Sequence, residues 1–399
     1  MNSYPELRLR PNAERLLIKG HPWVFSGAVA ARHADARRGS IVDVVNDRGR
    51  FIGRGTANPG AEIAVRILTR QPDQVIDAGF IRTRVERAVE LRRRSPLLHG
   101  VEALRLVHGE SDGLPGLVVD DYAGWVVFQI HTAGMEAMRD WVLAALLEVV
   151  SPRGLYERSD VGTRRAEGLR NRPTGPAAGD EPPGLIEFHE GEVPLAVDIR
   201  RGQKTGFFLD QRDNRRLLAS VARGRSLLNV FAYTGGFTAH ARHAGAVSSL
   251  DVDLSPQALR LGRRISGGLG GGPHRSLAAE AFSCLDHLAE AGRRYGLVVL
   301  DPPSLVRKGR DLKHAMGVYT KLNRNGFRLV EDGGYLLTSS CSTRVTEEDF
   351  FQIVRRAASG ARVDARIVAR THHPADHVVD PAFPEGRYLS SALVRVDRG

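Results

Sequence analysis

The chain has 399 residues, of which 42% are hydrophobic and 26% are charged, so it is long enough for two or three globular domains and too apolar to be disordered. No apolar run reaches the roughly 18 residues of a membrane-spanning helix, and the first residues lack the pattern of a secretion signal. Two cysteines exclude a disulfide framework, so we expect a cytoplasmic protein with no membrane partner and no metal.

The net charge of +11 favours a polyanionic partner, and nucleic acid is the more common one. A basic surface that serves only solubility is the alternative. Nearly all the basic residues are arginines, which is consistent with genome composition, but that bias does not produce the net excess of positive charge.

The first 188 residues predict two small units. In 1–73, short apolar runs separated by Gly, Asn and Pro predict a β-rich domain. In 74–188, a basic helix over 80–94, strand patterns at 116–120 and 125–130 and a helical pattern over 135–150 predict a central α/β domain. Four prolines among Gly and Ala predict a loop over 170–184.

The remainder, 189–399, alternates strand and helix patterns in the order of a doubly wound parallel sheet. The predicted strands are 226–231, 247–253, 297–301 and 334–339, and the predicted helices are 236–243, 255–265, 281–293 and 312–330. The fold class is therefore α/β, with a C-terminal Rossmann-like sheet preceded by two smaller domains.

The first strand-to-helix turn of this sheet contains Gly235, where backbone can approach a ligand at the carboxyl end of the strand. Asp253 ends the next strand about 20 residues later, where a carboxylate can accept hydrogen bonds from both ribose hydroxyls. The pair indicates a nucleoside cofactor and leaves NAD and S-adenosylmethionine both open.

Two features favour the methyl donor. The turn lacks the Gly-x-Gly-x-x-Gly pattern that cradles a pyrophosphate. The strand over 297–301 ends in Asp301-Pro302-Pro303-Ser304, and because two prolines cannot extend a central strand, they form a rigid exit that presents Asp301 at the cofactor's methyl end. The structural alternative for Asp301 is an ordinary turn residue.

Cys341 follows the strand over 334–339 and is predicted at the same sheet edge as Asp301. C5 of a pyrimidine is not nucleophilic, so its methylation requires a thiolate that adds to C6 and activates C5. A small buried strand-end residue is the more common role of a single cysteine, but the position relative to Asp301 favours a nucleophile. Cys284, inside an apolar-periodic helix, is interpreted as packing.

With these residues in view, the sequence resembles, over nearly its full length, the bacterial large-subunit (23S) ribosomal RNA cytosine-C5 methyltransferases that carry an N-terminal PUA domain. The most specific match is Gly-Gln-Lys-Thr-Gly-Phe-Phe-Leu-Asp-Gln-Arg-Asp-Asn-Arg at 202–215. The other matching segments are 14–16, 20–28, 109–117, 157–161 and 384–386.

The resemblance implies a small PUA β-barrel, S-adenosylmethionine as cofactor and ribosomal RNA as partner. It implies that Cys341 is the nucleophile and that Asp301 contacts the base at N3 or the exocyclic amine. Relatives with a second cysteine after Asp-Pro have it where this chain has Pro303, which implies a single-cysteine mechanism. The expected cofactor residues are Lys204, Thr205, Phe207, Phe231, Tyr233, Thr234, Gly235, Phe237, Asp253, Leu254, Glu280, Ala281 and Asp301.

The chain departs from the family on the adenine side. The usual Asp after the third strand is replaced by Glu280, which can still accept from the adenine amine, and the usual Asn after the second helix is replaced by the glycine-rich run 267–272. For RNA contacts we expect Arg15, Lys19, His21 and Trp23, although core packing is the more common role of such a tryptophan in a small β domain.

Two other functions stay open beside the cytosine-C5 methyltransferase. An amino methyltransferase acting on an RNA purine would use the Asp-Pro-Pro turn and would not need Cys341. A non-catalytic ribosome-assembly factor would bind RNA with a vestigial cofactor fold. The target nucleotide, the choice between free and assembled RNA, the formation of a homodimer and the base that removes the C5 proton are not predicted.

Overall fold

A computed structural model describes residues 4–30, 36–305 and 312–398. The chain forms two compact units, and each unit is described by itself. The first unit contains 1–188, 197–207 and 375–386, and the second contains 189–196, 208–374 and 387–399. Segments 197–207 and 375–386 thus pack with residues far from them in sequence. The expected three-domain division remains a prediction. Among the described residues, no helix has the length and apolar character needed to cross a membrane.

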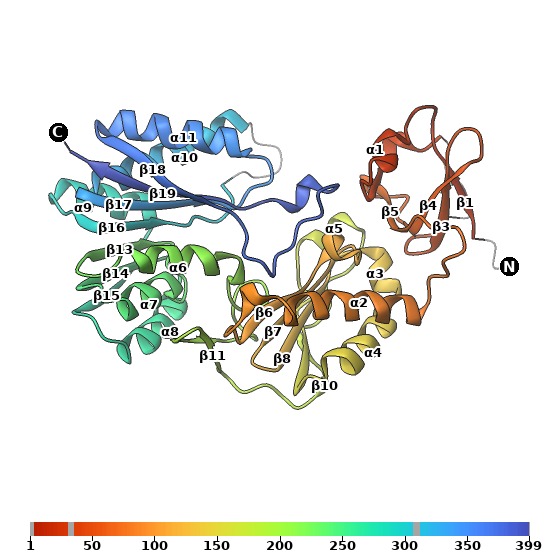
Figure 1. Cartoon of the computed structure of the whole chain (residues 1–399), viewed down its shortest axis with the longest axis horizontal. Helices are drawn as coiled ribbons and strands as arrows, with labels where there is room; N and C mark the ends of the chain where they lie inside the picture. The colour runs from red at the N-terminus through yellow and green to blue at the C-terminus, as the bar shows by residue number, and fades with distance from the viewer. Residues whose placement is uncertain (1–3, 31–35, 306–311, 399) are drawn as a thin grey trace. The chain divides into compact units, whose positions relative to one another are not determined.

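The N-terminal part of the first unit is a five-stranded sheet with the strand order β1-β3-β4-β5-β2 (Figure 1). Its strands are β1 (Glu6–Arg8), β2 (Trp23–Phe25), β3 (Ile41–Val45), β4 (Phe51–Ala57) and β5 (Ile63–Thr69), with the short helix α1 (Arg15–Ile18) beside them. Alternate residues of β3 point inward, so Val42 and Val44 are fully buried in a core with Leu9 and Val65. The predicted β-rich domain is confirmed.

A second five-stranded sheet follows, in the order β10-β9-β8-β7-β6. Its strands are β6 (Ala103–His108), β7 (Leu117–Tyr122), β8 (Trp125–Ile130), β9 (Gly154–Glu157) and β10 (Gly175–Gly179), and its helices are α2 (Ala78–Arg93), α3 (Ala133–Ala137), α4 (Arg139–Val150) and α5 (Thr163–Ala166). The apolar faces of α2 and α4 and the inner face of the sheet form one core. A two-stranded hairpin, β11 (Ile186–Glu190) and β12 (Val193–Val197), comes next in the chain.

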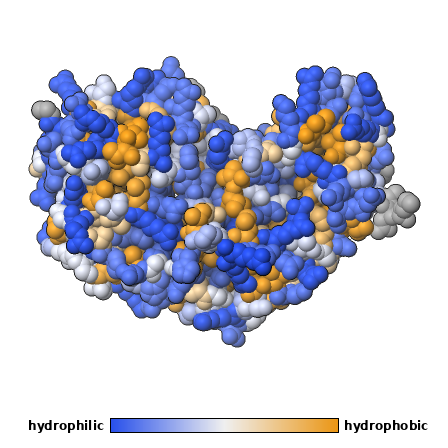
Figure 2. All heavy atoms as spheres, viewed as in Figure 1, coloured by the Kyte–Doolittle hydropathy of each residue, from blue (hydrophilic) through white to orange (hydrophobic). Residues whose placement is uncertain are grey.

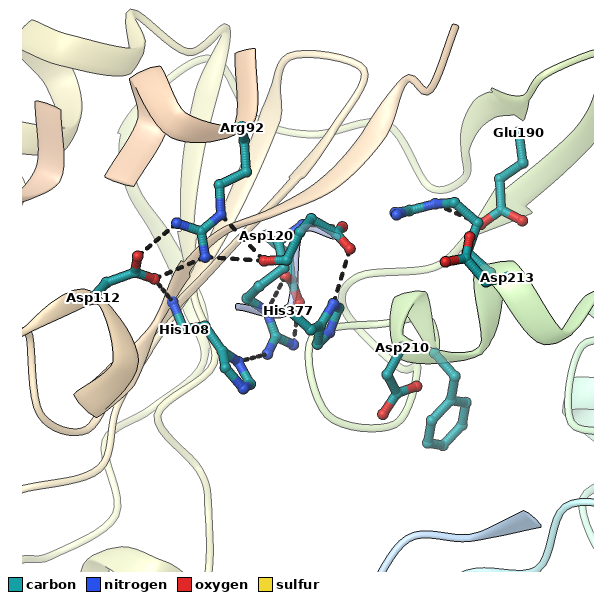
Figure 3. Close-up of polar contacts among 12 residues, drawn as sticks. Arg92, His108, Asp112, Asp120, Glu190, Asp210, Asp213 and His377 are labelled. Atoms are coloured by element: carbon teal, nitrogen blue, oxygen red, sulfur yellow. Dashed lines mark hydrogen bonds and ion pairs between the residues drawn. The ribbon is translucent and has the colours of Figure 1, made fainter. Parts of the chain in front are cut away.

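One expectation for this region is wrong. The predicted loop 170–184 contains strand β10, which pairs antiparallel with β9. Pro176 is tolerated there because β10 is an edge strand, where a missing N–H breaks no inner ladder. Arg92, near the end of the basic helix α2, is fully buried and forms a bidentate pair with Asp112 at 2.6 and 2.9 Å (Figure 3).

The second unit is a seven-stranded sheet in the order β15-β14-β13-β16-β17-β19-β18. Its strands are β13 (Ser226–Val230), β14 (Ser248–Asp253), β15 (His274–Ala278), β16 (Tyr295–Leu300), β17 (Val330–Ser340), β18 (Asp364–Thr371) and β19 (Ser390–Asp397). Its helices are α6 (Arg212–Ser220), α7 (Gly236–His243), α8 (Pro256–Gly267), α9 (Ala281–Glu290), α10 (Leu312–Arg328) and α11 (Glu347–Ala361).

Helices cover both faces of this sheet: α9, α10 and α11 share one core with it, and α6 and α7 share the other (Figure 1). The five strands β15, β14, β13, β16 and β17 are parallel, as predicted. Strand β19 pairs antiparallel with both β17 and β18. The parallel strands place all their carboxyl ends at one edge, which is where such sheets bind ligands.

Candidate active site

The turn from β13 into α7 is strained. Phe231 and Tyr233 have φ angles of 62° and 50°, and Gly235 has a φ of 73°. A positive φ costs a residue with a side chain roughly 1–2 kcal/mol. A Cβ atom at Gly235 would lie 2.9 Å from Oδ2 of Asp251, so this position requires glycine. Such strain is typical of a turn shaped to receive a ligand, and it falls on three of the expected cofactor residues.

Asp253 is fixed at the end of β14 by two backbone amides. Its Oδ2 accepts from the N–H of Tyr233 at 2.9 Å, and its Oδ1 accepts from the N–H of Ser255 at 2.8 Å. Each oxygen keeps a lone pair, so the carboxylate can still accept from the two hydroxyls of a ribose. Leu254, the next residue, is 72% exposed, as expected of an apolar side chain that covers an adenine.

Two further residues of the turn support the fit of S-adenosylmethionine. The hydroxyl of Thr234 is buried and has no hydrogen-bond partner among the described residues, so a ligand polar group can use it. Phe237 is buried at the start of α7, in the core that α6 and α7 share with the sheet. The predicted segment 231–237 is thus assembled at one place.

Glu280 occupies the edge position next to Asp253. Ala278, two residues before it, pairs with Asp253 across β14 and β15. Glu280 caps α9, because its Oε2 accepts from the N–H of Ser283 at 2.8 Å. Burial alone would raise the pKa of Glu280, but the amides of Ser283 and Phe282 lower it overall. The side chain is therefore a fixed carboxylate, and Ala281 after it is buried.

Asp301 and Cys341 leave the sheet at the same edge. They follow the neighbouring parallel strands β16 and β17, in which Leu300 pairs with Thr338. The Sγ of Cys341 lies 3.7 Å from the carbonyl oxygen of Pro302, so the thiol contacts the turn that carries Asp301. Cys284 is buried in the core, which confirms its interpretation as packing.

Gln211, which the sequence patterns did not indicate, contacts Asp301. Its Nε2 donates to Oδ1 of Asp301 at 2.7 Å. Its position depends on the start of α6, where Arg215 donates to the buried Glu190 through Nε at 2.8 Å and His240 lies 2.9 Å from the same oxygen. Only the 202–215 motif as a whole could have indicated this role.

Lys204, Thr205 and Phe207 belong to the first unit, where they form a tight segment. Lys204 has a φ of 54°, and Thr205 and Phe207 are buried. Thr205 donates its hydroxyl proton to Oδ2 of Asp120 at 2.5 Å. Because that proton is used, the hydroxyl of Tyr122 is the donor to Thr205 at 3.2 Å. The Tyr122 oxygen in turn accepts from the N–H of Phe207. Sequence reasoning missed Asp120 and Tyr122, because strand periodicity marks them only as inward-facing residues.

The four expected RNA contacts divide into two pairs. Arg15 and Lys19 are exposed on and beside α1. His21 is buried and lies 3.2 Å from Glu385, and the indole N–H of Trp23 donates to Glu110 at 3.0 Å. Within the first unit, His21 thus connects the N-terminal sheet to segment 375–386, and Trp23 connects it to the turn Gly109–Asp112. Their contact with RNA, like that of Arg15 and Lys19, remains a prediction.

Groups of three or more His, Cys, Asp or Glu side chains that could hold a metal ion do not occur among the described residues. The candidate site combines the glycine turn, three carboxylates at or just after the ends of β14, β15 and β16, and the thiol of Cys341 after β17.

Comparison with known proteins assigns two parts of the chain to protein families. Residues 7–70 match the PUA-like domain family, and residues 171–386 match the family of S-adenosylmethionine-dependent methyltransferases.

The chain is 38% identical to "Ribosomal RNA large subunit methyltransferase I" of Shewanella denitrificans over 98% of its own length and 99% of the relative's. It is 35% identical to the protein of the same name from Klebsiella pneumoniae, with 98% of both chains covered.

Two solved structures share the fold over 98% of this chain and 100% of theirs. A methyltransferase crystallised with SAH superposes with a TM-score of 0.86, and an S-adenosylmethionine-dependent methyltransferase from Streptococcus mutans superposes with a TM-score of 0.84. Each is 21% identical to this chain. The chain belongs to the family of ribosomal RNA large subunit methyltransferase I, which joins a PUA-like domain to an S-adenosylmethionine-dependent methyltransferase domain of Rossmann-like fold.

Proposed function

We propose that this methyltransferase methylates C5 of a cytosine in large-subunit (23S) ribosomal RNA through a covalent bond between Cys341 and C6. The observation that carries the proposal is the contact of the Cys341 thiol with the Asp301-Pro302 turn, at 3.7 Å, at the edge where the cofactor residues gather. An amino methyltransferase needs the carboxylate turn but has no use for a thiol beside it.

The substrate and location follow from the relatives and the charge. The matched relatives are named for the large ribosomal RNA, and the chain carries a net charge of +11. Figure 2 shows a face that is mostly hydrophilic, with smaller groups of hydrophobic residues between the polar ones. We infer that the protein acts in the cytoplasm and that the exposed Arg15 and Lys19 contact RNA backbone.

Cys341 and Asp301 divide the chemistry. The thiolate of Cys341 forms a bond to C6, and the electron pairs of the ring shift so that C5 becomes an enamine carbon and N3 takes up a proton. Asp301 holds the pyrimidine at N3 and the exocyclic amine. Once C5 carries the methyl group, loss of the C5 proton to solvent, expulsion of the thiolate from C6 and release of the proton from N3 restore the aromatic ring. The target base must leave its stack to reach Cys341.

S-adenosylmethionine, when bound, supplies an electrophilic methyl group. Asp253 would hold its ribose, the turn 231–237 its methionine part, and Leu254 with Glu280 and Ala281 its adenine. Lys204, Thr205 and Phe207 are proposed to take part in holding it, and the strained φ of Lys204 is the observation that supports this.

The test is transfer of labelled methyl from S-adenosylmethionine to bacterial ribosomal RNA, with the product nucleoside identified. Cys341→Ala is expected to lower turnover by about 10³-fold or more, because the C5 position cannot be activated without the thiolate. Cys284→Ala is the matched control, since it removes the other cysteine from the core of the same unit.

The native chain and Cys284→Ala should both yield 5-methylcytosine. An active Cys341→Ala variant, or an N-methylated purine as product, would contradict the covalent mechanism. Binding of RNA without any methyl transfer would support the assembly-factor function instead.

A further inference from the structure

A chain of buried hydrogen bonds begins at Asp301 and runs away from the sheet edge into the second unit. Gln211 donates from Nε2 to Oδ1 of Asp301 at 2.7 Å. The other end of its amide, Oε1, accepts from Nδ2 of Asn214 at 2.5 Å. Gln211 is only 3% exposed, so both ends of the amide depend on these partners.

Asn214 is itself held in one orientation. Its Nδ2 also donates to Oγ of Ser391 at 3.0 Å, and its Oδ1 accepts from the hydroxyl of Thr371. Ser391 lies 2.8 Å from Oγ of Ser339, two residues before Cys341 on β17. The hydroxyls of Ser391 and Thr371 can donate or accept, so they fit either orientation of the Asn214 amide. A flipped Asn214 amide would, however, present its oxygen to the oxygen of Gln211 and lose that bond.

The hydrogen bonds from Asn214 through Gln211 therefore run in one direction, from donor to acceptor toward Asp301. Because the Asp301 carboxylate accepts, Gln211 presents its N–H group to Asp301 and its oxygen faces inward, where Asn214 donates to it. The anchor of Asn214 on β18 and β19 is complete without Gln211, so Gln211 extends an already satisfied network to the site.

We propose that Gln211 is a positioning residue that sets the rotation and the acceptor face of the Asp301 carboxyl group for the pyrimidine. This rests on the function proposed above. With Oδ1 accepting from Gln211, the proton that Asp301 exchanges with the base is carried on Oδ2. As Cys341 bonds to C6 and the C4=N3 electron pair moves to N3, that proton passes to N3. It returns to Asp301 when the C5 proton has left to solvent and the C6–S bond breaks.

Two substitutions separate this role from simple packing. Gln211→Glu keeps the shape and the acceptor for Asn214 but replaces the donor with a second carboxyl group facing Asp301. Gln211→Leu removes both bonds. Asn325→Asp is the matched control, because Asn325 donates to Oδ1 of Asp286 at the same 2.7 Å, between α10 and α9 and outside the proposed site.

The measurement is steady-state methyl transfer to ribosomal RNA across pH 5.5 to 9, together with trapping of the covalent adduct on RNA that contains 5-fluorocytosine. Gln211→Leu should lower kcat about 10- to 100-fold at every pH, with KM for S-adenosylmethionine within about threefold of the native value. Gln211→Glu should lose turnover steeply as pH rises, because two facing carboxyl groups work only while they share a proton. Asn325→Asp should change neither kcat nor the pH profile.

Native turnover rates and pH profiles in both Gln211 variants would overturn the inference while leaving the proposed function intact. A pH-independent loss in Gln211→Glu equal to that of Gln211→Leu would also overturn it, since this is the result of a purely structural role. Failure of the proposed function looks different, because then the native protein itself forms no adduct and yields no 5-methylcytosine.

Discussion

Two carboxyl groups of the second unit, Glu190 and Asp251, are almost completely buried, and their surroundings shift their pKa values in opposite directions. Glu190, on β11, faces the guanidinium of Arg215, the side chain of Arg212 at 3.7 Å and the ring of His240. Burial alone would raise the pKa of Glu190, but these partners, with Arg215 foremost, hold it well below its ordinary value. Glu190 therefore stays charged in the protein interior.

Asp251, on β14 below the glycine turn, has mostly neutral partners. Thr238 and Asn229 both donate to its Oδ1, and Nε2 of His274 lies 3.9 Å from its Oδ2. Burial lowers the pKa of His274 to about 4, so this ring is uncharged near neutral pH. Burial raises the pKa of Asp251 to about 7, more than its hydrogen bonds and Arg242 lower it.

The difference teaches that burial alone does not decide the charge of a carboxyl group next to an active site. Glu190 fixes the start of α6, and hence Gln211, by ion pairs. Asp251 supports the turn at Gly235 through hydrogen bonds that survive protonation. Helix α7 supplies a partner to each, His240 to Glu190 and Thr238 to Asp251.

The largest expected effect comes from Glu190→Ala, which removes the buried carboxylate and its ion pairs. The substitution leaves two buried arginines without their carboxylate, which costs about 5 kcal/mol of unfolding free energy, the upper end for a buried ion pair. Urea denaturation measures the loss. Glu192→Ala is the control from the same hairpin, because its side chain is 91% exposed and should shift the unfolding free energy by less than about 0.5 kcal/mol. Equal stabilities of the two variants would show that the Glu190 ion pairs contribute nothing.

Asp251→Asn tests the second buried carboxyl group through the pH dependence of the unfolding free energy. Between its unfolded pKa of 3.8 and its native pKa of about 7, native Asp251 keeps a proton that the unfolded chain releases. Stability from this group is therefore full below pH 4 and falls as pH rises to 7. The three-unit shift corresponds to about 4 kcal/mol. Glu190, with its lowered pKa, contributes in the reverse sense: its stabilisation is present at neutral pH and is lost on acidification.

The measurement is urea unfolding of the native chain and Asp251→Asn from pH 4 to 8. The variant should gain stability relative to the native chain by up to about 4 kcal/mol across this range. Asp213→Asn, at a position whose side chain is 47% exposed, is the control and should follow the native curve. A constant difference at all pH values would mean that Asp251 is ionised throughout.

Asp253 extends the comparison to a carboxylate that we propose to contact the cofactor. It is half-buried, and its backbone partners leave lone pairs for a ribose. Asp253→Ala is expected to weaken binding of S-adenosylmethionine about 10- to 100-fold, the loss of hydrogen bonds to a charged acceptor. Titration calorimetry measures the affinity, with Asp213→Ala as the exposed control. Unchanged affinity would remove Asp253 from the cofactor site.

Sequence patterns predicted the strand-end residues well, for a physical reason. Asp253, Asp301 and Cys341 each follow an apolar run, and parallel strands bring such positions to one edge whatever the details of packing. Glu190, Asp251 and Gln211 were not predicted, because their partners come from distant segments and a buried polar residue looks locally like a surface one. Pro176 misled for the same reason: only the sheet order shows that its strand lies at an edge.

The smallest expected effect concerns a network of hydroxyl groups in the first unit. Tyr122 is fully buried, and its hydroxyl donates to Thr205 and accepts from the amide of Phe207. Tyr122→Phe leaves Thr205 bonded to Asp120 but removes an acceptor from the Phe207 amide, so about 1 kcal/mol of unfolding free energy should be lost. Thermal unfolding measures it, with Tyr156→Phe, a tyrosine of β9 in the same sheet, as the control.

Since segment 202–207 carries Lys204, the same variant should raise KM for S-adenosylmethionine severalfold if that segment holds the cofactor. A stability loss with an unchanged KM would instead confine Thr205 and Phe207 to a structural role.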